Sequence, residues 1–396
     1  MNDLLKKLNT EDISPYFDEC YEKIKDETDI PYWLSEEYIQ DIIIKKYDLL
    51  PENAEGIIAA LGEVVKNPDL VQFAKVLYEM AKSEDDGRKI LETMKFPTVP
   101  GGDLFAMFAV LAHYPDTYEE LKAAGADEKI LQDTFRMLDV YETDTIRNIG
   151  KLGFSPVGFW WTCLAKKKLI FRVGRLNFER MKNSNLGVYG FINKAGETAL
   201  LMDSGVPIAK DGFYAHSNAE FVTEFTETEE YWEGFAPDNA TATVKNEKTR
   251  LSKGEWSIFY KPGDDAVSVH IPTLGGFEPE IINGAMSACR EFFEKYFPDF
   301  HPTAYFCESW LLAPELTEFL KPDSNILKFN QRFYKYPSEA YCGKDVFTYV
   351  FHLPVPEKLE GCDFTSLPEN SSLQKKIKDH YLSGKTVHEV NGLYPY

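Results

Sequence analysis

One segment of the chain, residues 265–297, restricts the fold more than any other because it joins a strand pattern to a helix pattern through a glycine turn. Apolar and polar side chains alternate over residues 267–271, which predicts a half-buried strand. Apolar residues recur at helical spacing over residues 280–297, and Pro279 suits the first turn of a helix. Backbone N–H groups at such a helix start can hold an anion, so the turn is a candidate binding site.

The bulk composition allows a large core and argues against several classes of partner. The chain has 396 residues, enough for two or three domains, and 44% of them are hydrophobic. A net charge of −21 disfavours nucleic acid as a partner, because nucleic-acid binding needs a basic surface. No apolar stretch is long enough to span a bilayer, so no insertion into a membrane is expected.

The N-terminus and the cysteines indicate the expected location. Residues 1–7 lack the long apolar segment and the small-residue cleavage site of a signal peptide. The six cysteines are scattered and form no CxxC pair, which disfavours a zinc ribbon or a disulfide framework. These features predict a protein of the reducing cytoplasm.

The residue pattern changes near residue 150, which predicts two domains. Residues 1–150 predict short helices separated by Pro or Gly, and Asn67-Pro68-Asp69 is a start signal for one of them. Residues 204–250 are polar and have no clear period, so a loop or insertion is expected there. The predicted strands of the second half are 169–173, 186–192, 198–202, 256–260, 303–307 and 345–353. Its further helices are predicted at 314–320, from residue 324 onward, and at 371–382.

The order and spacing of several segments resemble a family of bacterial acyltransferase-domain proteins, which join a helical N-acyltransferase N-terminal domain to a GNAT-like C-terminal domain. The resemblance implies an α+β fold, with the helical domain at 1–150 and a GNAT-like mixed β-sheet domain with flanking helices at 151–396. It also implies acyl-CoA as co-substrate, with the pantetheine arm between strands 265–272 and 303–309. The segments that carry the resemblance are 174–179, the pair 262–264 and 269–272, 293–298, 307–312 and 324–329.

The resemblance also assigns the glycine turn to the phosphates of the cofactor. The family's usual turn, Arg/Gln-x-x-Gly-x-Gly/Ala, is replaced by residues 273–278, which contain no Arg or Lys. Backbone N–H groups would therefore have to hold the pyrophosphate, and Glu278 would repel it. Arg175 is a candidate for binding a substrate carboxylate, with an internal ion pair as the alternative. The residues implied for cofactor binding are Ile271, Thr273, Leu274, Gly275, Gly276 and Phe277.

Two residues are candidates for the catalytic base. Direct acyl transfer to an amine needs a base, donors for the thioester oxyanion and an acid for the leaving thiolate. His270 is the first candidate because imidazole titrates near neutral pH, although its alternative role is a hydrogen bond that holds the turn. Glu308, at the end of the next strand, is the second candidate, with binding to neighbouring backbone as its alternative. The expected acceptor is a small-molecule or peptide amine.

Two other functions stay open from the sequence. A non-catalytic binding or scaffold protein would keep the fold and lose cofactor binding, as Glu278 and the missing basic residue indicate. A thiol hydrolase would use Cys307 as its nucleophile, although a buried strand cysteine without electropositive neighbours is the simpler interpretation. No metal is expected, because the seven histidines are dispersed and form no HxH or HExxH pair.

Overall fold

The chain forms two compact units, Met1–Val173 and Gly174–Tyr396, and each is described here by itself. The predicted domain boundary at residue 150 lies before helix α10 (Pro156–Lys166), which belongs to the first unit. The computed structural model describes residues 3–10, 15–82, 96–140, 145–146, 150–273, 275–340, 343–356, 358–359 and 361–396.

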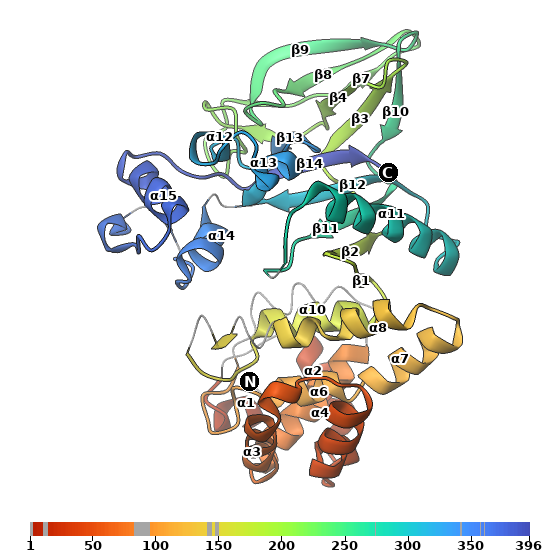
Figure 1. The fold of residues 1–396 in the computed structure, drawn as a ribbon, viewed down its shortest axis with the longest axis vertical. Helices are drawn as coiled ribbons and strands as arrows, with labels where there is room; N and C mark the ends of the chain where they lie inside the picture. Colours follow the sequence, from red (N-terminus) through yellow and green to blue (C-terminus); the bar gives the residue numbers. More distant parts are fainter. Residues whose placement is uncertain are drawn as a thin grey trace. The chain divides into compact units, whose positions relative to one another are not determined.

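The first unit is helical, as predicted (Figure 1). Helix α4 begins after Asn67, whose side-chain oxygen accepts hydrogen bonds from the N–H groups of Asp69 and Leu70, and this confirms the predicted start signal. Every residue of α6 is buried, and the Phe73 and Phe105 rings of α4 and α6 lie 5.0 Å apart. The helices are α1 (Asp3–Lys7), α2 (Pro15–Ile24), η1 (Tyr32–Leu34), η2 (Tyr38–Lys46), η3 (Pro51–Asn53), α3 (Ala54–Val65), α4 (Pro68–Lys82), α6 (Phe105–Leu111), α7 (Tyr114–Ala123), α8 (Glu128–Phe135) and α10, followed by strand β1 (Ile170–Val173).

The second unit is built on a mixed sheet whose strands run in the order β2-β11-β12-β14-β13. Strands β11 and β12 are parallel, and the other neighbouring pairs of these five strands are antiparallel. The sequence patterns predict β11 and β12 but not β13 and β14, which join the sheet from the last third of the chain. The strands are β2 (Leu176–Met181), β11 (Asp265–His270), β12 (Pro302–Ser309), β13 (Tyr334–Pro337) and β14 (Val390–Pro395).

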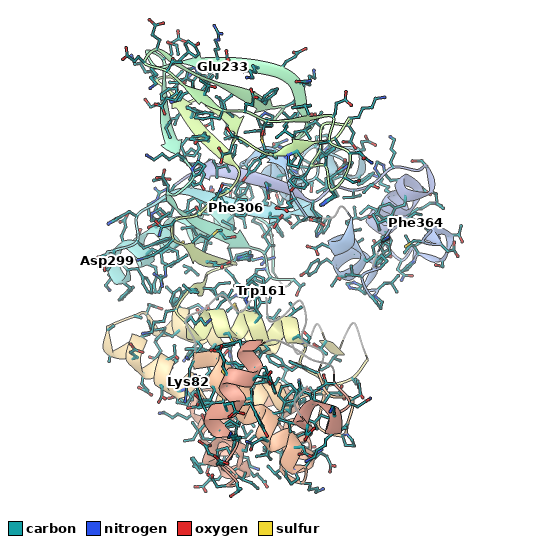
Figure 2. The ribbon with its side chains drawn as sticks, turned by 180° about the vertical axis from the view of Figure 1, so that it is seen from behind. Lys82, Trp161, Glu233, Asp299, Phe306 and Phe364 are labelled. Atoms are coloured by element: carbon teal, nitrogen blue, oxygen red, sulfur yellow. The ribbon has the colours of Figure 1, made fainter. Side chains whose placement is uncertain are left out.

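Helix α11 (Pro279–Tyr296) covers one face of the central sheet, close to the predicted range 280–297. Its buried side chains follow helical spacing, and the Tyr305 hydroxyl of β12 donates a hydrogen bond of 2.9 Å to the Met286 carbonyl of α11. On the opposite face, Ala266, Ala304 and Leu393 join a cluster of buried residues from the smaller sheets. Figure 2 labels Phe306 on β12, and the side chain of Phe306 packs against the same cluster.

The smaller sheets correct the prediction that residues 204–250 form a loop. Strands β8 (Tyr231–Pro237) and β9 (Val244–Ser252) pair in an antiparallel hairpin. Most residues of β9 are exposed and polar, so the strand has no apolar alternation to reveal it and depends on backbone pairing with β8. The remaining strands are β3 (Val188–Asn193), β4 (Thr198–Met202), β5 (Pro207–Ile208), β6 (Phe221–Val222), β7 (Thr226–Glu227) and β10 (Trp256–Tyr260).

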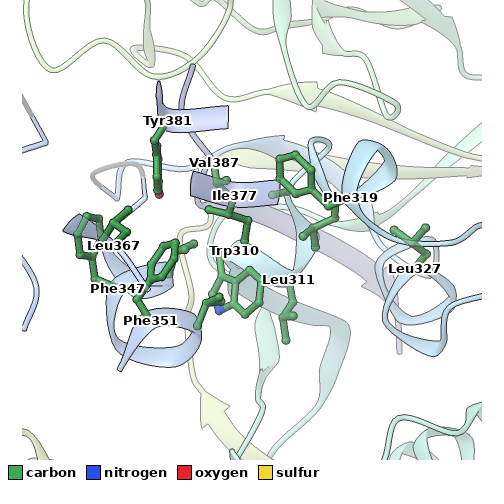
Figure 3. Close-up of a cluster of buried hydrophobic side chains, with 14 residues drawn as sticks. Trp310, Leu311, Phe319, Leu327, Phe347, Phe351, Leu367, Ile377, Tyr381 and Val387 are labelled. Carbon is green, nitrogen blue, oxygen red and sulfur yellow. The ribbon is translucent and has the colours of Figure 1, made fainter. Parts of the chain in front are cut away.

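The strand predicted at residues 345–353 is also wrong, because this run is helical. It forms α14 (Lys344–Val346) and the π-helix η5 (Phe347–Phe351). A short apolar run fits a buried helix as well as a buried strand, and here it packs against α15 (Ser372–Leu382) in the cluster shown in Figure 3. The other short helices of this unit are η4 (Trp310–Leu312), α12 (Leu316–Phe319), α13 (Asn325–Asn330) and η6 (Phe364–Ser366).

Candidate active site

The two parallel strands at the centre of the sheet separate before they end. Their pairing runs from Asp265 with Pro302 to Ser268 with Phe306 and goes no further. Strand β11 continues to pair with β2 as far as His270, while β12 continues to pair with β14 as far as Ser309. Each strand therefore follows its outer neighbour, and a gap opens between them at their carboxyl ends.

His270 lies at this gap and is hydrogen-bonded to a carboxylate. Its Nε2 atom lies 2.8 Å from Oε2 of Glu179 on β2, and the His270 and Glu179 side chains are 27% and 13% exposed. Glu179 pairs with Ser268, two residues before His270, so both side chains lie on the same face of the sheet. This face is opposite to the one that α11 covers, because the Val267–Tyr305 pair contacts α11.

A buried amide lies next to this histidine–glutamate pair. Asn177 is paired directly with His270 across β2 and β11, and only 6% of it is exposed. Its side-chain oxygen has no hydrogen-bond partner among the residues that the structure describes. Neither Asn177 nor Glu179 was a candidate from the sequence. The available signal was the alternation of Asn177 and Glu179 around Phe178 in a strand, which places two polar side chains on one face.

Glu308 lies on the other side of the gap, in a group of carboxyls. Its side chain is exposed and accepts a hydrogen bond from the Ser338 hydroxyl, rather than from His270 or from neighbouring backbone. Removal from water by the surrounding protein, followed by the charge of Glu308, raises the pKa of Asp345. Burial, then the charge of Asp345, raises the pKa of Glu389 to about 9. These three residues come from β12, α14 and the segment before β14, and only Glu308 was singled out in the sequence.

The glycine turn between β11 and α11 leaves its two glycines open to solvent. Gly275 has φ +108°, a backbone conformation that favours glycine, and both Gly275 and Gly276 are exposed. Thr273 is exposed as well, whereas Ile271 and Phe277 are partly buried and pack against the cluster of Figure 3. Leu274 lies outside the described residues.

Arg175 supplies the basic group that the turn itself lacks. Its Nε atom donates a hydrogen bond of 2.9 Å to the Gly276 carbonyl, and its guanidinium carbon lies 5.1 Å from the centre of the Phe277 ring. A side chain that begins 101 residues before Gly276 therefore brings a positive charge to the turn. These two contacts are to a backbone carbonyl and an aromatic ring, and they do not test the alternative of an ion pair for Arg175.

Glu278 places a negative charge on the same turn. Its carboxylate folds back over Gly276 so closely that a Cβ atom on Gly276 would clash with it. The side chain makes no capping hydrogen bond to α11, although Glu278 is the N-cap residue. The start of α11 thus holds a carboxylate where its backbone would favour an anion.

Cys307 has the surroundings of a core residue. It is fully buried in β12, and burial raises the pKa of its thiol, an effect that the charges of Glu308 and Glu389 increase. A thiol with a raised pKa is a poor nucleophile, which argues against the thiol hydrolase.

In the described parts of the chain, no three His, Cys, Asp or Glu side chains are grouped in a way that could bind a metal ion. None of the helices there combines the length and the apolar composition that crossing a bilayer requires. The cytoplasmic location stays a prediction.

Comparison with known proteins agrees with the two-part architecture. Residues 170–394 match the family described as GNAT-like C-terminal domain, and residues 42–165 match the family described as N-acyltransferase N-terminal domain. Because the first match covers more than half of the chain, the chain belongs to the GNAT-like C-terminal domain family. This confirms the resemblance and the α+β fold of helical domain and GNAT-like sheet domain. A search of the curated proteins finds no match.

Several solved structures share the fold over almost the whole chain. One is an acyltransferase in complex with decanoyl-CoA and teicoplanin, with a TM-score of 0.66, 17% identity, and coverage of 99% of this chain and 98% of that chain. Another is an acyltransferase in complex with CoA and 10C-teicoplanin, with a TM-score of 0.65, 17% identity and the same coverage. A third, in complex with decanoyl-CoA, has a TM-score of 0.64, 19% identity and again that coverage.

Proposed function

We propose that the chain is an acyl-CoA-dependent N-acyltransferase that moves the acyl group to an amine by direct attack. The observation that carries the proposal is the gap between β11 and β12, which opens beside His270 and leads to the glycine turn. A gap between two parallel strands gives room for a narrow, amide-containing arm such as pantetheine. The similarly folded acyltransferases crystallised with CoA and acyl-CoA support this choice of co-substrate.

The residues of the turn fit the phosphates of CoA. Backbone N–H groups at the start of α11 and the Arg175 guanidinium would hold the pyrophosphate, and exposed Gly275 and Gly276 leave the backbone accessible. Ile271, Thr273, Leu274 and Phe277 remain proposed members of the same site. Glu278 would have to leave its place over Gly276, because two negative groups cannot share the helix start without repulsion.

His270 would act as the base, with Glu179 as its positioning residue. The amine nitrogen attacks the thioester carbonyl carbon, and the C–S bond breaks with its electron pair on the leaving CoA thiolate. One proton of the amine passes to the imidazole, which can then give it to the thiolate. If the Nε2–H group of His270 donates to Glu179, then Nδ1 is the nitrogen that can accept this proton. Glu179 also stabilises the imidazolium that forms. Glu308 stays a proposed second base, although its contacts place it with other carboxyls.

The acceptor is proposed to be an amine on a small molecule or peptide. The similarly folded enzyme in complex with teicoplanin supports a compact acceptor of that kind. The neighbours' acyl chains, decanoyl in two complexes, make acyl-CoAs of medium length the first donors to try.

Calorimetric titration with acetyl-CoA and decanoyl-CoA tests the proposal. Binding of at least one of them is expected, and it should weaken in Arg175→Ala and strengthen in Glu278→Gln. The second variant is a gain of binding, so it cannot be mistaken for loss of folding. Glu255→Gln, at the exposed turn between β9 and β10, is the matched control. If neither thioester binds the wild-type protein, the proposed function is wrong.

A further inference from the structure

Three polar atoms beside Glu308 lack hydrogen-bond partners among the described residues. They are Oε1 of Glu389, the hydroxyl oxygen of Tyr336 and Oδ1 of Asn391. Glu389 is 5% exposed and Tyr336 is 1% exposed, so water cannot easily replace the missing partners. Oδ1 of Asn391 can only accept a hydrogen bond, whereas a protonated carboxyl group and a phenol hydroxyl can each donate one as well as accept one.

The strand register brings these groups to one place. Tyr336 pairs with Asn391, and Asn391 pairs with Glu308, so the three side chains lie in a row on one face of the sheet. Glu389 directly precedes β14, where Val390 pairs with Ser309. The charge of Glu308 raises the pKa of both Tyr336 and Glu389, which is consistent with short separations between these groups.

The carboxyl groups of this site have no cationic partner in the described part of the chain, and the raised pKa of Glu389 keeps that buried group protonated near neutral pH. Glu308, Asp345 and Glu389 form no ion pair there, and the nearest histidine in sequence, His388, is bound to Glu315 at 2.7 Å. Backbone hydrogen bonds from Asp345 and Trp310 offset only part of the effect of burial on Glu389. Glu308 is exposed, so a ligand can reach the group from solvent.

We propose that Glu308, Asp345 and Glu389 bind a second, cationic amino group of the acceptor, so that the acceptor carries at least two amines. This inference rests on the proposed function, and it gives Glu308 a role in acceptor binding beside its proposed role as a second base. An ammonium group has three N–H donors and a positive charge, which match a site that offers carboxylates and unpaired acceptors.

The direct test measures binding of spermidine to the full-length protein by calorimetry, without acyl-CoA. Binding is expected, and butylamine should bind at least about tenfold more weakly because it can fill only one of the two amine positions. Glu389→Gln and Asp345→Asn should each weaken spermidine by about tenfold or more. Glu389→Gln keeps the shape of the buried, protonated carboxyl group, so it is expected to fold. Its amide cannot release a proton and take on a negative charge when an ammonium group binds. Glu255→Gln serves as the control.

The second test measures release of the CoA thiol with spermidine or butylamine as acceptor. The wild-type protein is expected to have the higher kcat/KM with spermidine, and the ratio of the two values should fall toward one in Glu389→Gln. Equal use of both amines, or unchanged spermidine binding in both variants, would overturn the inference. The proposed function has a separate readout, since acyl-CoA binding can succeed or fail independently of spermidine binding.

Discussion

Replacing Glu389 with Gln should stabilise the second unit, and the gain should increase with pH. The structure raises the pKa of Glu389 from 4.5 to about 9, mainly through burial and then through the charge of Asp345. When folding raises the pKa of a carboxyl group, the folded state becomes less stable as the pH rises from the unfolded-state pKa toward the folded-state pKa. Above pH 4.5 the unfolded chain releases this proton while the folded protein keeps it.

The size of the effect follows from the interval between the two pKa values. Each pH unit within that interval costs about 1.4 kcal/mol, so by pH 7 the cost is about 3 kcal/mol. Glu389→Gln cannot ionise and escapes this cost, while its amide has the size of the protonated carboxyl. The neighbouring Asp345 has a raised pKa of its own, so part of the pH dependence should remain in the variant.

Urea unfolding followed by tryptophan fluorescence at pH 5 and pH 8 measures the effect. The difference in free energy of unfolding between the variant and the wild-type protein should be small at pH 5 and clearly in favour of the variant at pH 8. Glu255→Gln, at an exposed turn, should show no such difference between the two pH values. A difference that is constant with pH, or one that favours the wild-type protein at pH 8, would show that Glu389 ionises normally in the fold.

Three further predictions concern the base, the core and the cysteine. His270→Ala should lower the acyl-transfer rate by about 10²–10⁴-fold while calorimetry shows unchanged acyl-CoA binding; equal loss of both would contradict its role as base. Gly190→Ala should lower the free energy of unfolding measured in urea by about 1–3 kcal/mol, because the new Cβ atom would lie 2.5 Å from Phe259. Gly284→Ala in α11 should raise it by about 1 kcal/mol, because the new Cβ atom would meet nothing within 4 Å. Cys307 should resist iodoacetamide in the folded protein, because burial raises the pKa of its thiol, and mass spectrometry after digestion would reveal any modification.

The strand, the turn and the helix of residues 265–297 could be predicted because the signals there are local. Alternation identifies β11, helical spacing identifies α11, and Pro279 marks the helix start. The basic group of the turn could not be predicted in the same way. Arg175 reaches Gly276 only because β2 lies beside β11, and no pattern in the sequence reports that neighbour.

The carboxyl group beside the gap was largely hidden for the same reason. Glu308, Asp345 and Glu389 lie in separate segments, and the sequence patterns do not predict the structure of two of those segments. The helix at α14 was predicted as a strand, and β14 was not predicted. A site assembled from such segments depends on long-range packing, which competes with and overrides the local patterns.

The separation of β11 from β12 gives the sheet an edge in its interior. Most sheets leave backbone groups unpaired only at their outer strands, where another chain can add to them. Here the pairing of the two strands stops at Ser268 and Phe306, although both strands are central. Amide hydrogens on this inner edge should exchange with solvent faster than those of Ala266 to Ser268 on the same strand. A ligand that fills the gap would cover these amide groups, so its binding should slow their hydrogen exchange.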